Sequence, residues 1–315
     1  MSTYIWRVSS PYTPSTTFDI RRTVDVTHVE SLISPIDLFI AKNRELNALL
    51  IDPNNFSTQI DALNFQKKVS KKAVVELKKA LSNPLIISPM LANLILLGHI
   101  SAVESYFRAI FRKLVIIDQE TQRLCYEKSL HYGAVLVHEK HSLPDALLEF
   151  ISFSSKANIE STLKEFFGTK GNLPAGLANS LEEFNKICQL RHSIIHKFGT
   201  LGANNLKHDL MNLTNYINKP IKNDFSSIQD ISLICKNVVL ELNQLIWQTS
   251  MIRLIADYQS NKWRKRLTTP FSWKWSTDKK LFKSYFDLFF STEAKPANPK
   301  MKDAYLDLNT TYNSL

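Results

Sequence analysis

Residues 89–114 read PMLANLILLGHISAVESYFRAIFRKL, and this stretch gives the strongest evidence for the fold class. Its apolar residues recur at steps of three and four, the spacing that keeps side chains on one face of an α-helix. The residues that follow this spacing are Leu91, Leu94, Ile95, Leu97, Ile100, Val103, Phe107, Ile110, Phe111 and Leu114. The stretch therefore predicts a long central helix in a mainly all-α protein.

The same region is apolar enough to raise the question of a membrane span. Residues 85–103 carry no charged side chain over a length that can cross a bilayer. Polar or helix-bending residues interrupt or closely follow this run: Pro89, Asn93, His99, Glu104 and Arg108. A buried core helix is therefore the preferred interpretation, and no membrane partner is expected.

Composition also favours helices. Glycine accounts for only 7 of 315 residues, so few tight turns are available for a many-stranded sheet. A hydrophobic content of 44% over this length is enough for a substantial core, in one large domain or two smaller ones. The net charge of +10 biases the partners toward polyanions, such as nucleic acid or an acidic protein.

Cysteine usage and the start of the chain predict a compartment. Cys125, Cys188 and Cys235 are odd in number, far apart and set among apolar helical residues. We therefore expect reduced core thiols rather than disulfides or a zinc site. The opening MSTYIWRVSS lacks the basic-then-apolar order of a signal peptide, and a cytoplasmic location is predicted.

Residues 1–86 are predicted to form an N-terminal extension. Alternating apolar residues at Phe18, Ile20, Val24 and Val26, with residues 4–8 as a partner, indicate a small β element. Two helical segments are expected between residues 34 and 80. The second carries the lysines Lys67, Lys68, Lys71, Lys72, Lys78 and Lys79. A solvated basic face is the preferred interpretation, and an RNA-tracking surface that includes Lys71 and Lys72 is the alternative.

Residues 87–260 are predicted to form the main helical domain. Helices beyond the central one are expected near residues 120–138, 144–153 and 159–167, before a loop with Gly168, Gly171, Pro174 and Gly176. The next helix is expected from about 181 to 198. Ser180 and Glu183 form a Ser-x-x-Glu capping box, and Gly199 stands where a left-handed terminator belongs.

A further long helix is expected after a polar stretch at residues 200–225. Ser227 and Asp230 are predicted to start it. A nearly heptad seam then packs either internally or against a second chain, through Ile231, Ile234, Val238, Leu242, Leu245, Thr249 and Ile252.

Residues 261–315 are predicted to form a helical C-terminal extension rich in cations and aromatic rings. Rings stack on bases and cations hold phosphates, so Trp273 and Trp275 are candidate RNA contacts. Docking on the helical body explains the same pattern equally well, and would involve Trp273, Phe282, Phe286 and Phe289.

The helix expected at 181–198 carries the residues that suggest chemistry. Residues 184–199 read FNKICQLRHSIIHKFG. At 100° per residue, the apolar face consists of Phe184, Ile187, Leu190, Ile194 and Phe198, and is predicted to be core. The opposite side carries Asn185, Gln189, His192 and His196, with Arg191 at its flank.

This combination suits cleavage of RNA. The reaction needs one group to take the proton of a ribose 2′-hydroxyl, another to protonate the departing 5′-oxygen, and positive charge at the phosphorane. Histidine changes charge near neutral pH, and arginine offers a planar fork to phosphate oxygens. No metal or other cofactor is expected, because the sequence shows no carboxylate cluster typical of a two-metal nuclease.

The six residues from Arg191 to His196 resemble the Arg-x4-6-His motif of the HEPN superfamily, including the polar residue after the arginine. The glycine-rich loop before the helix, Gly199 after it, and an upstream helix with Glu104-Ser105-Tyr106 strengthen the resemblance. It covers residues 87–258.

The resemblance implies a compact helical bundle that dimerises so that two motif helices meet in one cleft. It also implies catalytic roles for Arg191 and His196, and an orienting or second acid-base role for His192. Glu104, which lies near a packed stripe and needs a partner, is expected to hold Arg191, with Asn185 also in support. Lys197 is a weaker candidate for contact with RNA.

Two functions are therefore carried forward. The first is a metal-independent endoribonuclease, of a toxin or antiphage defence system, restrained by a protein partner, by the flanks or by assembly of the dimer. The alternative is a non-catalytic helical RNA-binding or protein-scaffold module with the same fold. A metal site at His138 and His141 is a weak competitor, because no third ligand suggests itself.

Overall fold

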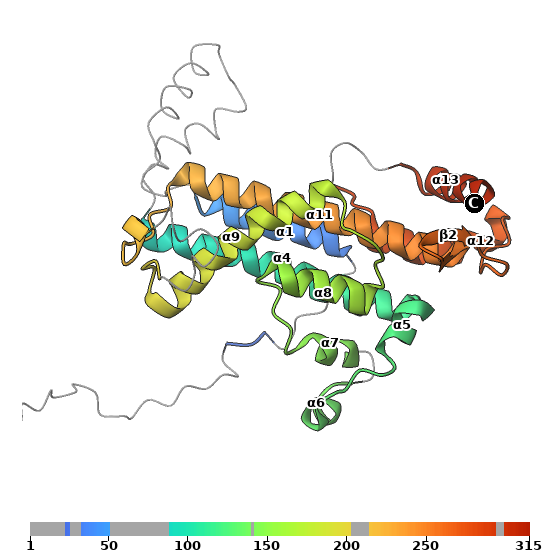
Figure 1. Cartoon of the computed structure of the whole chain (residues 1–315), viewed down its shortest axis with the longest axis horizontal. Helices are drawn as coiled ribbons and strands as arrows, with labels where there is room; N and C mark the ends of the chain where they lie inside the picture. The colour runs from blue at the N-terminus through green and yellow to red at the C-terminus, as the bar shows by residue number, and fades with distance from the viewer. Residues whose placement is uncertain (1–22, 26–32, 51–87, 140–141, 203–213, 294–298) are drawn as a thin grey trace, which may run out of the picture. The chain divides into compact units, whose positions relative to one another are not determined.

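The computed structural model of the chain describes residues 23–25, 33–50, 88–139, 142–202, 214–293 and 299–315 (Figure 1). The chain divides into two compact units, Met1–Ile33 and Ser34–Leu315. Of the first unit, only residues 23–25 and 33 are described. The β element expected at the N-terminus, except for Val24, and the basic segment with Lys71 and Lys72 lie outside the described residues.

The unit Ser34–Leu315 is mainly all-α, as predicted. Its helices are α1 (Pro35–Ala48), α4 (Pro89–Ile117), α5 (Gln119–Cys125), α6 (Tyr132–Val137), α7 (Leu143–Leu148), α8 (Lys156–Phe167), α9 (Ala175–Lys197), the short 3-10 helix η4 (Thr214–Tyr216), α11 (Phe225–Ile255), α12 (Trp275–Phe289) and α13 (Met301–Ser314). The strands are β1 (Ala256–Gln259) and β2 (Lys262–Lys265).

Helix α4 is the predicted central helix. It is 29 residues long, and Pro89 stands in its first turn, where a missing N–H costs no hydrogen bond. Helices α1, α9, α11 and α12 all pack against it. Among the described residues, α4 is the helix long and apolar enough to cross a membrane, but in this unit its apolar stripe forms the core. Only the first turns differ from the prediction, since Leu91 and Leu94 are exposed.

His99 lies in the middle of α4 without contact with solvent. Its exposed fraction is 0%, and neither ring nitrogen has a hydrogen-bond partner in the part of the chain that the structure describes. Burial lowers the pKa of His99 to about 4, because the charged imidazolium loses its hydration. The ring is therefore neutral in the folded protein at pH 7.

Acidification is expected to destabilise the fold through His99. The unfolded chain binds a proton at a pKa near 6.5 and the folded chain only near 4, so the loss begins below pH 6.5 and grows toward pH 4. It should reach about 3 kcal/mol at pH 4. Urea unfolding at pH 7 and pH 4 tests this with His99→Leu as the comparison. Equal losses in both proteins would contradict the assignment to His99.

Several helix boundaries differ from the prediction, among them that of α7, which ends at Leu148 rather than near residue 153. The helix expected at 120–138 is split into α5 and α6, and α6 buries no side chain, so no core contact favours a continuous helix. Helix α9 begins at Ala175, ahead of the expected start near 181. Ser180 and Glu183 therefore lie inside the helix, and the capping box was wrong. The buried side chains of Leu177 and Leu181 stabilise the additional turns at the start.

Helix α11 is 31 residues long, and its N-cap is Asp224, whose carboxylate accepts the backbone N–H of Ser227 at 2.7 Å. The predicted start at Ser227 and Asp230 was therefore wrong, because both residues lie inside the helix. The heptad seam packs internally: Ile231, Val238 and Leu242 are buried, and α11 lies against α1, α4 and α9. Figure 1 shows α4, α9 and α11 running alongside one another.

A β-hairpin follows α11, and the sequence analysis did not predict it. Strands β1 and β2 pair antiparallel with Ala256 opposite Lys265. Ser260 and Asn261 form the turn with φ values of 49° and 61°, the left-handed pair typical of a two-residue hairpin. The domain boundary predicted at 260/261 falls in this turn.

The aromatic residues of the C-terminal extension dock on one another and on the body. Trp273 stacks on Tyr312 with ring centroids 4.6 Å apart, and its Nε1 is buried. Trp275 lies 5.2 Å from Tyr305. Phe282 and Phe289 are buried, whereas Phe286 is half-buried. This arrangement favours docking over base stacking for Trp273 and Trp275.

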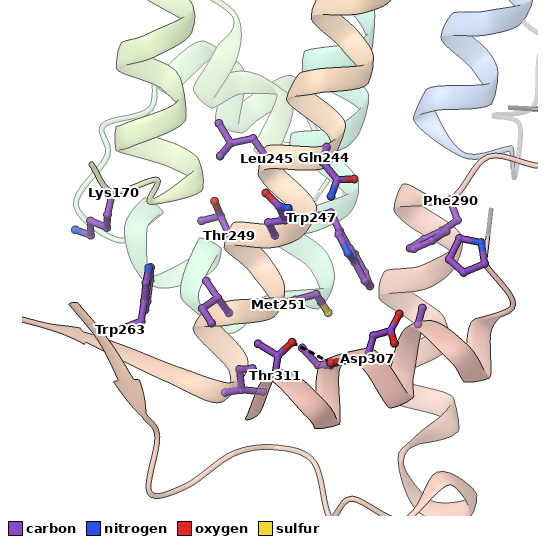
Figure 2. A pocket seen from close by; sticks show the side chains of 16 residues that line it. Lys170, Gln244, Leu245, Trp247, Thr249, Met251, Trp263, Phe290, Asp307 and Thr311 are labelled. Carbon is purple, nitrogen blue, oxygen red and sulfur yellow. Dashed lines mark hydrogen bonds between the residues drawn. The ribbon is translucent and has the colours of Figure 1, made fainter. Parts of the chain in front are cut away.

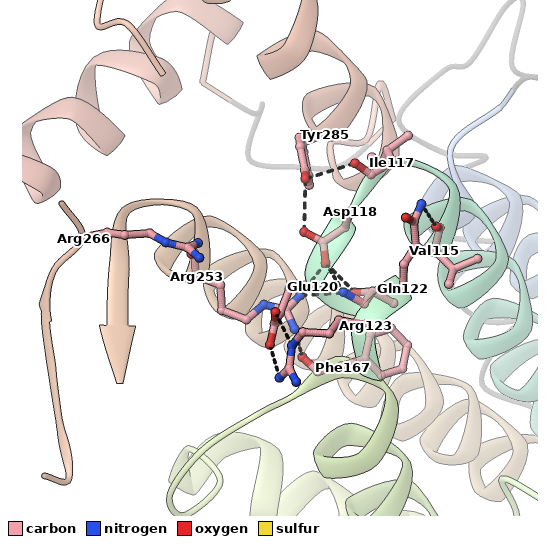
Figure 3. A network of polar contacts seen from close by, with 11 residues as sticks. Val115, Ile117, Asp118, Glu120, Gln122, Arg123, Phe167, Arg253, Arg266 and Tyr285 are labelled. Atoms are coloured by element: carbon pink, nitrogen blue, oxygen red, sulfur yellow. Dashed lines mark hydrogen bonds and ion pairs between the residues drawn. The ribbon is translucent and has the colours of Figure 1, made fainter. Parts of the chain in front are cut away.

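A buried ion pair joins the α4–α5 junction to α11 (Figure 3). Arg253 Nη2 lies 3.0 Å from Asp118 Oδ2, and these side chains are 8% and 1% exposed. Arg253 Nη1 also donates to the carbonyl of Phe167 at 2.6 Å, and the hydroxyl of Tyr285 donates to Asp118 Oδ1 at 3.1 Å. The network therefore fixes the ends of α4, α8, α11 and α12 together.

Candidate active site on helix α9

Helix α9 presents one face to the core and the other to solvent. It packs against α4, α8 and α11. The residues that it buries are Leu177, Leu181, Phe184, Ile187, Cys188 and Ser193. Of the predicted core face, Leu190 and Ile194 are half-buried, and Phe198 is 87% exposed. Phe198 leaves the helical face because its φ of 49° ends the helix.

His192 and His196 lie together on the exposed face. Their ring centroids are 4.4 Å apart with an interplanar angle of 47°, as expected for side chains one helical turn apart. Both residues are exposed, and Arg191 beside them is half-buried. The structure thus places two imidazoles next to each other where a phosphate can reach them, and Arg191 directly precedes His192 on the helix.

Arg191 and Glu104 approach the same buried thiol. Burial raises the pKa of Cys188, and the charge of Arg191 opposes this rise whereas Glu104 adds to it. Glu104 Oε1 accepts the backbone N–H of Phe153 at 3.3 Å. Within the described residues, Glu104 and Arg191 form no ion pair. Glu104 therefore holds the segment before α8, and its expected role toward Arg191 remains a prediction.

Asn185 also has a structural contact. Its Oδ1 accepts the backbone N–H of Lys156, the first residue of α8, at 3.3 Å. The ammonium of Lys156 in turn lies 2.7 Å from Glu182 on α9. Asn185 thus helps to hold the start of α8 against α9, one and a half turns before Arg191.

The C-terminus of α9 is held by an unusual backbone turn. Phe198 and Gly199 both have left-handed φ values, 49° and 80°, and both donate their N–H to the carbonyl of Ser193. The carbonyl of Gly199 then accepts the N–H of Ile221 at 2.7 Å. This turn fixes the last turn of α9, in which His196 lies.

Replacing Gly199 with alanine is expected to destabilise the protein by about 1–2 kcal/mol. The φ of 80° disfavours a side chain, and the new Cβ would lie 3.0 Å from Nδ2 of Asn93 on α4. Urea unfolding measures the change. Gly133→Ala is the control, because nothing lies within 4 Å of its Cβ position and α6 tolerates alanine. Equal stability of Gly199→Ala and the wild type would contradict this role.

Of the weaker candidates Lys197, His138 and His141, the structure describes the first two. Lys197 is exposed, and its ammonium lies 2.7 Å from the point where a Cβ on Gly202 would stand. His138 ends α6 with its Nδ1 3.4 Å from the hydroxyl of Ser142, and His141 lies outside the described residues. In the part of the chain that the structure describes, His, Cys, Asp and Glu side chains form no cluster able to hold a metal ion.

Comparisons of the chain with protein-family models, with curated proteins and with solved structures found no match. The interpretation of α9 therefore rests on its own residues and geometry.

The structure also contains a cavity that the sequence analysis missed. It has a volume of about 660 Å³ and lies between α11, β2 and α13. Trp247 and Trp263 are among its walls. Trp247 gave no separate signal in the sequence because it stands within the apolar pattern of α11.

Proposed function

We propose that this chain is a metal-independent endoribonuclease with a HEPN-like helical bundle. The observation that carries the proposal is the pair of exposed imidazoles of His192 and His196 on α9, with ring centroids 4.4 Å apart and the half-buried Arg191 directly before His192 in the chain. Histidine is the side chain best suited to exchange protons near neutral pH.

The reaction follows from these groups. A neutral imidazole takes the proton of the ribose 2′-hydroxyl as the 2′-oxygen attacks the adjacent phosphorus. A protonated imidazole gives its proton to the 5′-oxygen as the P–O5′ bond breaks. Arg191 stabilises the negative charge of the phosphorane. The products are a 2′,3′-cyclic phosphate and a free 5′-hydroxyl.

We propose that the active form is a homodimer. The resemblance to HEPN proteins places two motif helices in one cleft, and His196 is flanked by exposed apolar side chains on α9. Ile195 is 48% exposed and Phe198 is 87% exposed, which is unfavourable unless a partner covers them. The same resemblance suggests a toxin or antiphage defence effector in the cytoplasm, regulated by an inhibitory or activating protein partner.

The experiment that tests the activity is incubation of purified protein with total and transfer RNA in excess EDTA, followed by analysis of the end groups. We expect cleavage that survives chelation and leaves 2′,3′-cyclic phosphate ends. The control is an RNA with a single 2′-deoxy sugar at the cleavage site, which lacks the attacking hydroxyl and should stay intact. Cleavage of this control at the same position would refute the mechanism. RNA that is bound but never cut would favour the alternative, a non-catalytic RNA-binding module.

A further inference from the structure

We propose that the cavity between α11, β2 and α13 binds an unpaired base of single-stranded RNA, and that cations of β2 hold the neighbouring phosphates. The choice of RNA as the ligand rests on the proposed function. The cavity itself is a second site, away from the histidines of α9.

The walls of the cavity are aromatic. Trp247 of α11, Trp263 of β2 and Phe290 after α12 all line it. In Figure 2, Trp263 stands with Lys170 on one side, and Trp247 stands near Phe290 on the other. Aromatic walls favour planar ligands, and every base offers a face for stacking.

Trp263 differs from the other tryptophans of the C-terminal extension. It is half-buried, lines the cavity and makes an edge-on contact with Tyr258 at 5.0 Å. Trp273, in contrast, is stacked on Tyr312. Trp263, unlike Trp273, thus has open space beside its ring.

Polar groups at the cavity match the edge of a base rather than a purely apolar ligand. Gln244 and Gln248 contribute side-chain amides that both donate and accept hydrogen bonds. Lys170 and Asp307 contribute charges, and neither side chain forms an ion pair within the described residues. Base edges display donors and acceptors side by side, and unpaired bases expose them fully.

The cations of β2 are the candidate partners for the phosphates of such a strand. Side chains alternate along a strand, so Lys265 shares a face with Trp263, and its ammonium lies 4.1 Å from the ring centre of Tyr312. Lys262 and Arg264 are exposed on the other face. In the described part of the chain these three cations have no acidic partner, whereas Arg266 pairs with Asp257. Unneutralised cations beside an aromatic wall are typical of single-strand binding.

The distance to α9 sets the length of RNA that can use both sites. Gly176, near the start of α9, lies against Glu241 of α11, one turn before the cavity begins at Gln244. His196 is 21 residues after Ala175, which corresponds to roughly 32 Å along the helix. A stacked strand advances 3.4 Å per nucleotide, so at least about ten nucleotides are needed to span the two sites.

The test is fluorescence anisotropy of a 5′-labelled twelve-nucleotide oligouridylate with the full chain carrying His196→Ala, at one fixed salt concentration. Adding Trp263→Ala should raise Kd by about 5- to 150-fold, the range expected for loss of one stacked base. Trp263→Phe should retain most of the affinity. The control is Tyr126→Ala, an aromatic residue that is 78% exposed and outside this cavity. It should leave Kd unchanged.

A second variant tests whether an effect of Trp263→Ala on Kd arises only from misfolding of the β1–β2 hairpin. Thr311 lies on the α13 wall and is exposed, so Thr311→Glu adds a negative charge without removing a packed ring. It should raise Kd about tenfold or more. The proposal is overturned if both cavity variants bind like their parent, or if a twelve-base-pair RNA duplex binds as tightly as the single strand.

The nuclease proposal and the cavity proposal can each be rejected without rejecting the other. Binding that depends on Trp263 in a protein that never cleaves RNA would keep the cavity and reject the nuclease. Cleavage of long RNA with the same KM in wild type and Trp263→Ala would keep the nuclease and reject the cavity.

Discussion

Replacing His196 with alanine is expected to lower the rate of RNA cleavage by about 10²- to 10⁴-fold, the usual contribution of a general acid or base. Arg191→Ala should lower it by about 10²- to 10³-fold, because the phosphorane loses its cationic partner. Single-turnover cleavage in EDTA measures both effects. In each case kcat should fall more than KM rises, since the groups act in the transition state.

A matched control separates chemistry from general damage. His131 is also exposed but lies before α6, with its ring 4.4 Å from that of Phe150. His131→Ala should therefore cleave RNA at the wild-type rate. Because His196 is exposed, its replacement should change the free energy of unfolding by no more than about 0.5 kcal/mol. Wild-type cleavage by His196→Ala would remove this residue from the mechanism.

Replacing Asp118 with alanine is expected to destabilise the fold by about 3–5 kcal/mol, the cost of leaving a buried charge without its partner. Arg253 would keep the carbonyl of Phe167 but lose the carboxylate 3.0 Å away. Asp118 also accepts the N–H and the hydroxyl of Thr121, at 2.7 and 2.6 Å, so the start of α5 would loosen as well. Urea unfolding at pH 7 measures the loss.

Two comparisons test whether the loss arises from the bare charge. The double variant Asp118→Ala with Arg253→Met should be more stable than Asp118→Ala alone, because no unpaired charge is then buried. Glu183→Ala breaks the pair of Glu183 with Lys186, in which both side chains are half exposed, and should cost less than about 1 kcal/mol. A loss equally small for Asp118→Ala would show that the buried pair contributes nothing.

The helices were predictable where burial follows a local period. The spacing of three and four around Ile100 and Phe107 predicted α4, and the heptad seam around Val238 predicted α11, because each helix turns one face to the core. The hairpin Ala256–Lys265 was not predicted. It consists of two short strands, and the sequence at its turn, Ser260 and Asn261, lacks the glycine that usually marks such turns.

The candidate site was predictable in part for the same reason. His192 and His196 share one side of α9 because helical geometry places residues four apart next to each other, whereas Arg191 directly precedes His192 and is half-buried. The partner of Glu104 depends on which loop crosses α4, and the structure places the N–H of Phe153 there. Such a contact between distant segments has no local pattern in the sequence.

The sequence by itself therefore determined the mainly helical fold, the central helix α4 and the shared face of His192 and His196, since all three depend on helical periodicity. The tertiary structure alone decided the buried pair of Asp118 and Arg253 and the cavity beside Trp263. Both require residues more than 50 positions apart to meet, and that meeting depends on how the helices pack rather than on any one segment.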